Sequence, residues 1–142
     1  MFKTIFKKKV KKNINSQNIL VAALLIHAAK MDENYTNEEI EIIKKALKEL
    51  SDVSSDEIIE IIKIAEKLEE DSNQIIEFTK EIKKNSMEFR LKVIEILWKI
   101  IYSDGKADQY ESNLIRRICG LLYVSDKDNG DIKLKIKNQL IK

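Results

Sequence analysis

The chain has 142 residues, of which 35% are Asp, Glu, Lys or Arg; it contains three glycines, one cysteine, one histidine and no proline. One cysteine excludes an internal disulfide, and the scarcity of glycine and proline leaves too few turn residues for a many-stranded β-sandwich or barrel. The length suits one domain that buries its own core without disulfides or metal ions. We therefore expect a single all-α domain.

The net charge of +2 averages two unlike parts of the chain. Residues 1–12 contain six lysines and no acid, which leaves residues 13–142 with a charge of −4. We expect residues 1–15 to form a basic N-terminal arm and residues 16–142 to form a mildly acidic helical domain. One short basic arm beside an acidic body is a poor electrostatic footprint for nucleic acid, which we exclude as a partner.

The apolar side chains of the arm fall near one helical face: Phe2, Ile5, Phe6 and Val10. Lysines surround that face, as in helices that lie in a membrane interface. The pattern predicts a peripheral membrane contact through Phe2, Phe6, Lys7, Lys8 and Lys9, since each lysine near an anionic leaflet contributes about 1 kcal/mol. The alternative is a terminal helix that packs Phe2 and Phe6 against the bundle.

An apolar run over residues 19–29 follows the basic start. It has no small-residue cleavage site, which argues against a secretory signal. It is also 11 residues long, against the roughly 20 that cross a bilayer. We expect a cytoplasmic protein, or one held at the inner face of the membrane by its arm, and a lone cysteine fits that reducing compartment.

The first predicted helix covers residues 19–31 and is apolar on nearly every side, which is typical of a helix at the centre of a bundle. From Thr36 the pattern becomes amphipathic. Thr36 and Glu39 have the spacing of a capping box, in which two side chains satisfy free backbone amides at a helix start. Ser54 and Glu57 repeat that spacing before a third helix.

A short fourth helix and a long fifth helix come next. Asp71 or Ser72 is predicted to cap the fourth, and Ser86 to open the fifth, which ends at residues 103–105. Aromatic residues at helical spacing are more typical of a core than of a binding site. The residues expected in the core on this ground are Phe78, Phe89, Trp98 and Tyr102.

Asp108 and Glu111 have capping-box spacing before a sixth helix. Residues 126–131 are polar and predict a turn. An amphipathic piece over residues 132–141 then closes the domain, which gives a bundle of about seven helices.

A shift of 72 residues superposes the chain on itself. It aligns an apolar helix, an acidic loop and a capped amphipathic helix in each copy, so we expect two pseudo-equivalent helix-loop-helix units. The aligned pairs are Val21 and Val93, Leu25 and Leu97, Asp32 and Asp104, Glu39 and Glu111, Ile43 and Ile115, and Leu50 and Leu122. In the second copy Gly105 follows the loop Asp and suits a sharp helix exit, whereas Glu33 holds that place in the first.

The loops carry two motifs, HAAKMD followed by Glu39 and IYSDG followed by Glu111 and the pair Arg116 and Arg117. These motifs resemble the TerB family, which is named for bacterial tellurite resistance. The resemblance covers roughly residues 16–124. It implies a compact bundle of about seven helices in a cytoplasmic bacterial stress-response protein, with acidic loops suspected of binding divalent metal. Kinship with the N-terminal domain of a membrane-anchored DnaJ-type co-chaperone implies a protein partner.

The first candidates for ligands of a divalent cation are Asp104, Asp108 and Glu111, and the second are Asp32 and Glu39. Hard cations such as Ca²⁺ and Mg²⁺ prefer oxygen ligands, and two or three carboxylates per loop would hold one weakly. The loops lack the ligand spacing of an EF-hand, and a single histidine and cysteine cannot supply a structural zinc site. The alternative is that these acids only cap helices.

No enzyme activity and no catalytic residue is expected. Cys119 lies on the apolar side of the sixth predicted helix and His27 lies in the apolar first helix, so both are expected to be structural. The chain has no glycine-rich loop that would cradle the phosphate of a cofactor. The predicted function is that of a non-enzymatic stress-response module with a metal-binding role, or else of a protein-interaction module.

Overall fold

The computed structural model describes residues 16–32, 35–72, 74–104 and 108–140. Within these ranges the regular structure is entirely helical, which confirms the all-α prediction. The helices are, in chain order, α2 (Ser16–Ala29), η1 (Lys30–Asp32), α3 (Asn37–Leu50), α4 (Ser55–Asp71), α5 (Ile76–Ile82), α6 (Met87–Ile101), η2 (Tyr102–Asp104), α7 (Gln109–Leu121) and α8 (Asp126–Leu140). The elements η1 and η2 are short 3-10 helices.

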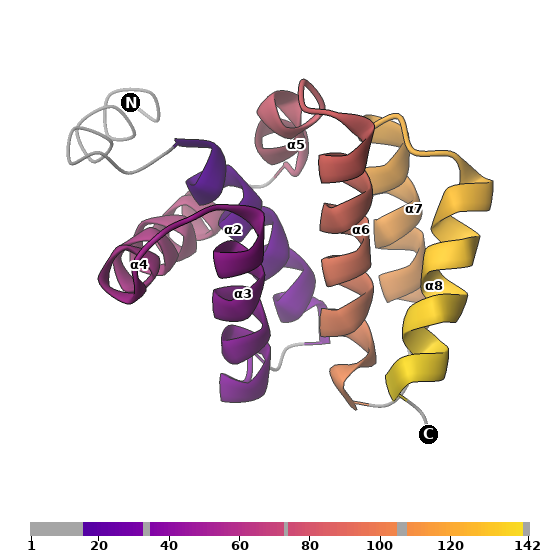
Figure 1. Ribbon diagram of the computed structural model, residues 1–142, viewed down its shortest axis with the longest axis horizontal. Helices are drawn as coiled ribbons and strands as arrows, with labels where there is room; N and C mark the ends of the chain where they lie inside the picture. Colours follow the sequence, from indigo (N-terminus) through magenta and orange to yellow (C-terminus); the bar gives the residue numbers. More distant parts are fainter. Residues whose placement is uncertain (1–15, 33–34, 73, 105–107, 141–142) are drawn as a thin grey trace.

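Helix α2 lies at the centre of the bundle, as its composition predicts. Every side chain over residues 19–29 is buried except that of His27. Helices α3, α4, α5 and α6 all pack on it, as Figure 1 shows. A helix without a polar face is stable here because it is covered on all sides.

The internal repeat includes a third helix beyond the two that were predicted. Elements η1 and η2 are 72 residues apart, and so are Thr36 and Asp108, the N-caps of α3 and α7. Helix α4 follows α3 and packs on α2, and α8 follows α7 and packs on α6. Each repeated unit therefore consists of three helices: an apolar helix, α2 or α6, and the two helices that follow it in the chain.

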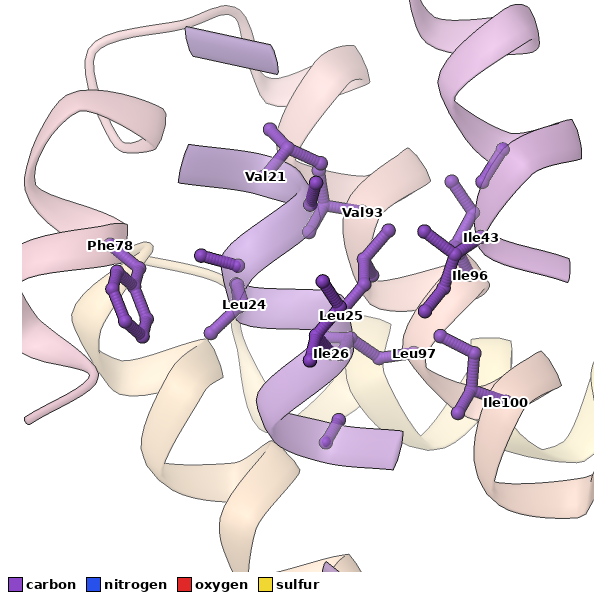
Figure 2. Packing of buried hydrophobic residues seen from close by; sticks show 14 of the residues in the cluster. Val21, Leu24, Leu25, Ile26, Ile43, Phe78, Val93, Ile96, Leu97 and Ile100 are labelled. Carbon is purple, nitrogen blue, oxygen red and sulfur yellow. The ribbon is translucent and has the colours of Figure 1, made fainter. Parts of the chain in front are cut away.

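The two units meet through equivalent residues of α2 and α6. Val21 lies beside Val93 and Leu25 near Leu97 (Figure 2), and all four are buried. Contacts between equivalent residues require the two helices to run in the same direction, as they do in Figure 1. The units are thus related by an approximate two-fold axis along the helices, which places equivalent loops at one end of the molecule.

Helix α5 breaks this symmetry. On one side of the bundle α3 packs directly on α6; on the other side α5 stands between α2 and α7 and contacts both. Its Phe78 and Ile82 are buried, and Figure 2 shows Phe78 projecting from α5 toward α2. In a fully symmetric pair α7 would pack on α2 as α3 packs on α6. Helix α5, which lies between the two units in the chain, takes that position on α2 instead.

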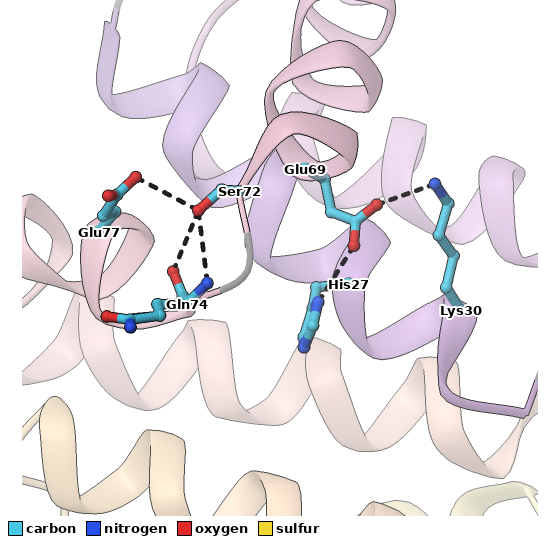
Figure 3. A network of polar contacts seen from close by, with 6 residues as sticks. All are labelled: His27, Lys30, Glu69, Ser72, Gln74 and Glu77. Atoms are coloured by element: carbon cyan, nitrogen blue, oxygen red, sulfur yellow. Dashed lines mark hydrogen bonds and ion pairs between the residues drawn. The ribbon is translucent and has the colours of Figure 1, made fainter. Parts of the chain in front are cut away.

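The predicted cap of α5 is wrong. Helix α5 begins at Ile76 after the N-cap Ile75, which makes no side-chain capping bond. Ser72 instead ends α4, and its hydroxyl donates to Glu77 at 3.2 Å and accepts from the Gln74 amide at 3.4 Å (Figure 3). Burial of the apolar face of α5 fixes the start of this short helix, and sequence capping signals do not report such burial.

The predicted turn over residues 126–131 is also wrong, because α8 begins at Asp126. The hydroxyl of Ser125 accepts from the Asp128 amide at 3.1 Å and caps the first turn. Asn129 then accepts from the indole Nε1 of Trp98 at 2.9 Å. The segment is helical because Ser125, just before it, caps α8 and because Asn129 satisfies the buried indole of Trp98 on α6, a long-range bond that local composition does not report.

Tyr123, just after α7, has a positive φ of 57°. Its amide donates to Gly120 O at 3.4 Å and the Val124 amide to Cys119 O at 2.9 Å, which is the Schellman pattern that glycine favours. We expect Tyr123→Gly to relieve the left-handed strain and stabilise the fold by about 0.5–1 kcal/mol. Urea unfolding measures the change. Tyr110→Gly, within α7, is the control and should have the opposite sign.

Candidate functional site

Both acidic loops lie at one end of the bundle. Helices α2 and α6 both end there, in η1 and η2, and α3 and α7 both begin there (Figure 1). Asp32 and Asp104 are the last residues of η1 and η2. The fold therefore brings the first and the second candidate sets of metal ligands, which lie 72 positions apart in the chain, to the same end of the bundle.

Each loop leads into a complete capping box. At α3, Oε1 of Glu39 accepts from the Thr36 amide at 2.9 Å, and the Thr36 hydroxyl accepts from the Glu39 amide at 3.1 Å. At α7, Oε1 of Glu111 accepts from the Asp108 amide at 3.1 Å, and Oδ1 of Asp108 accepts from the Glu111 amide at 2.8 Å. The predicted capping role of all four residues is confirmed.

The glutamates of these two boxes are buried, which capping alone does not require. Glu39 and Glu111 are each 5% exposed. Glu57 occupies the same place after the N-cap Ser54 of α4, where it accepts a 3.2 Å bond from the Ser54 hydroxyl, yet it is exposed. A buried carboxylate is costly unless it is well partnered. The two loop glutamates thus differ from an ordinary capping acid of the same protein.

The structure describes three of the five predicted ligands as side chains. Glu39 and Glu111 are buried as above, and Asp108 is exposed at the start of α7. The side chains of Asp32 and Asp104 lie outside the described part of the chain. Among the side chains that are described, no three of His, Cys, Asp or Glu gather closely enough to hold a metal ion.

A polar cluster beside the first loop was not predicted. The carboxylate of Glu69, near the end of α4, contacts Nδ1 of His27 at 3.1 Å and Nζ of Lys30 at 2.8 Å (Figure 3). It joins the end of α4 to the end of α2. His27 and Glu69 are 42 residues apart, so neither spacing nor periodicity indicates their contact.

Tyr35 extends this cluster toward α3. Its ring lies 5.8 Å from Nζ of Lys30. Burial and the neighbouring carboxylate of Glu66 raise the pKa of its phenol, which stays protonated at neutral pH. Its buried hydroxyl makes no hydrogen bond of good geometry with the described residues. The ring of Tyr35 and the ammonium group of Lys30 therefore lie together shortly before the start of α3.

Cys119 is buried on α7, as expected. Burial, with a smaller contribution from Asp126, raises the pKa of its thiol to about 12. At pH 8 only about one thiol in ten thousand is then ionised. We predict that Ellman's reagent leaves the folded protein almost unmodified and titrates one thiol per chain in urea. Rapid stoichiometric reaction of the folded protein would show an accessible, activated thiol instead.

A groove of about 510 Å³ lies between α3 and α6 and reaches the loop end. Its apolar surface comes from Ile42, Ala46 and Ile96, and it extends to Tyr102 and Ser103 of η2. Its remaining lining residues are Glu38, Lys45, Glu49 and Lys99. Sequence reasoning missed this groove because its walls come from different repeats and each lining residue is ordinary for the surface of an amphipathic helix.

No helix in the described part of the chain is both long and apolar enough to cross a membrane. The residues predicted to contact a membrane surface, Phe2, Phe6, Lys7, Lys8 and Lys9, lie outside the described residues. The membrane contact therefore stays a prediction.

Comparison with known proteins identifies the family. The family model described as tellurite resistance protein TerB matches residues 18–134. Neither a curated protein nor a solved structure matches the chain significantly. The matched range contains both acidic loops and both capping boxes, and it covers well over half of the chain. The chain therefore belongs to the TerB family.

Proposed function

We propose that this TerB domain is a non-enzymatic stress-response module of the tellurite-resistance type that binds a divalent cation, Ca²⁺ or Mg²⁺, at its acidic loops. The observation that supports it most is the paired burial of Glu39 and Glu111, in contrast to the exposed Glu57. Each of these buried carboxylates accepts a hydrogen bond from the N-cap amide that follows its loop, and a carboxylate fixed in this way is suited to orient the loop around a hard cation.

The second loop is the stronger candidate. Asp104, Asp108 and Glu111 would supply carboxylate oxygens, and water would complete the coordination of Ca²⁺ or Mg²⁺. Oδ1 of Asp108 already accepts from the Glu111 amide, which fixes the orientation of its carboxylate. In the first loop Asp32 and Glu39 hold the equivalent positions. A cation at either loop would lower the repulsion among acids that the fold collects at one end.

The proposal assigns no catalytic residue. The thiol of Cys119 is buried and its pKa is raised. The imidazole of His27 contacts Glu69 on α4 rather than a nucleophile. These two side chains are the ones that could have formed a cysteine and histidine pair, and each has a structural explanation.

Isothermal titration of the full chain with Ca²⁺, Mg²⁺ and Mn²⁺ tests the metal proposal. Glu111→Gln keeps a side chain that can still cap the helix but removes its charge. It should weaken binding at the second loop by at least about tenfold, the usual cost of removing a ligand or its support. Glu57→Gln, the same change in an exposed capping acid, should leave binding unchanged. Equal binding by all three proteins would place the cation elsewhere.

The groove between α3 and α6 favours a second candidate function, a protein-interaction or co-chaperone-like module. Its volume and apolar floor are those of sites that bind ligands or peptides, and the basic arm would add a loose membrane contact at the inner face. Co-sedimentation with anionic vesicles tests that contact. The full chain should sediment with the vesicles and a chain lacking residues 1–12 should not; equal, negligible binding by both would remove the membrane part.

A further inference from the structure

A separate hollow of about 490 Å³ lies between α3 and α4, where the first helix ends and the second begins. It is on the side of the bundle away from α8 (Figure 1). Because α3 starts at the acidic loops, the hollow lies farther along α3, toward the other end of the bundle. The residues that line this basic hollow are Glu41, Lys44, Lys45, Lys48, Ser55, Ile58 and Ile59.

The lining of the basic hollow is positive, although the helical domain around it is acidic. Three lysines and one glutamate give the lining a formal charge of +2, whereas residues 13–142 together have a charge of −4. In the groove between α3 and α6, two glutamates and two lysines cancel. A general abundance of lysine would raise the charge of both places, so it does not explain the difference.

Two lysines of the basic hollow are available to a ligand. Nζ of Lys44 pairs with Glu41 at 3.3 Å, which offsets the acid of the lining. Lys45 and Lys48 are exposed and make no ion pair with the residues that the structure describes. A lysine at position 48, in the last turn of α3, also suits the helix dipole. Lys45 lies before that turn, so the dipole does not account for it.

The opposite wall of the basic hollow offers an apolar contact. Ser55, Ile58 and Ile59 have the spacing of residues that share one face of a helix. Ile58 is buried, whereas Ile59 is 47% exposed, so the packing of the bundle leaves half of an isoleucine uncovered beside the lysines. The acids in the first turn of α4, Asp56 and Glu57, lie outside the lining.

We propose that the basic hollow binds an acidic segment of a partner protein, one that presents carboxylates beside an apolar side chain. The carboxylates would pair with Lys45 and Lys48, and the apolar side chain would cover Ile59. A phosphate group alone would leave Ile59 uncovered, and a flat bilayer would not reach the floor of a recess. The inference goes beyond metal binding at the loops, which concerns another face, and does not rest on it.

Amide NMR spectra of the full chain, titrated with short random peptides, test the proposal. One peptide pool combines Asp, Glu, Leu and Phe, and in the control pool Asn and Gln replace the acids. The acidic pool should shift the amide signals of Lys45, Lys48 and Ile59 and leave those of α8 unchanged. The control pool should shift neither. Each amide reports its own surroundings, so acidic peptides attracted to residues 1–12 register separately.

Variants of exposed side chains connect these shifts to the basic hollow. Lys45→Gln together with Lys48→Gln should weaken binding of the acidic pool by about three- to tenfold, the effect of losing two exposed ion pairs. Ile59→Ser should weaken it by about fivefold, because half of an isoleucine side chain is no longer covered. Lys127→Gln together with Lys137→Gln removes the same charge from exposed positions of α8 and should change nothing.

Several results would overturn the proposal. One is the absence of a saturable shift in α3 and α4 with the acidic pool, and another is equal binding by the lysine variant of α3 and the control variant of α8. Stronger shifts of the same amides with inorganic phosphate, a single-stranded oligonucleotide or anionic lipid vesicles would assign the hollow to phosphate groups. Shifts that grow with protein concentration when no peptide is present would assign it to a second copy of the chain.

Discussion

Leu25→Ala should destabilise the protein by about 2–5 kcal/mol, the cost of a cavity left by a fully buried leucine. Leu25 has no exposed surface and lies where α2 meets α6. The free energy of unfolding of a domain of this size is typically about 5–15 kcal/mol, so one such cavity removes a large share of that stability. Urea unfolding followed by circular dichroism measures the loss.

The same experiment tests the packing of equivalent residues. Leu97→Ala should cost a similar amount, and the double variant with Leu25→Ala should be non-additive by about 0.5–3 kcal/mol because the two side chains share one site. Ile136→Ala, on α8 at the other side of α6, is the matched control. Its effect should add to that of Leu25→Ala. Additivity of Leu25 and Leu97 would contradict the approximate two-fold contact.

Phe78→Ala should cost about 3–5 kcal/mol, the range for a buried phenylalanine. Phe78 is 1% exposed and anchors α5 between α2 and α7. Its loss should also release the amides of α5 to hydrogen exchange before those of α2, because a seven-residue helix has little stability of its own.

Ile76→Ala is the control for Phe78→Ala, since it lies on the same helix but is 54% exposed. It should change stability by no more than about 0.5 kcal/mol. If the two variants cost the same, α5 is not held by its buried face and its place between α2 and α7 is incidental.

Much of the fold follows from local patterns that the structure confirms. The apolar run of α2 predicts a central helix, capping spacing predicts the starts of α3, α4 and α7, and Ser86 is predicted to open α6. The errors occur where long-range contacts override local signals. Residues 126–131 are polar, but Asn129 is needed in α8 to bond Trp98. Helix α5 has no capping side chain and depends on its burial.

The sequence predicts which residues belong to the candidate site, but it does not predict their burial or their neighbours in space. The repeat indicated Glu39 and Glu111, and the capping spacing explained one of their roles. Their burial, at 5% exposure each, depends on tertiary packing, which no single segment encodes. The contact of Glu69 with His27 and the groove between α3 and α6 join residues far apart in the chain. Such features require the tertiary structure.

Binding of a divalent cation at the loop end is the central functional claim, and a melting curve of the full chain tests it most directly. A ligand that binds only the folded state stabilises it by about 2.7 kcal/mol at one hundred times its dissociation constant. Millimolar Ca²⁺, Mg²⁺ or Mn²⁺ should therefore raise the melting temperature relative to chelator, and Glu111→Gln should reduce the rise. An unchanged melting temperature with all three metals would contradict the claim.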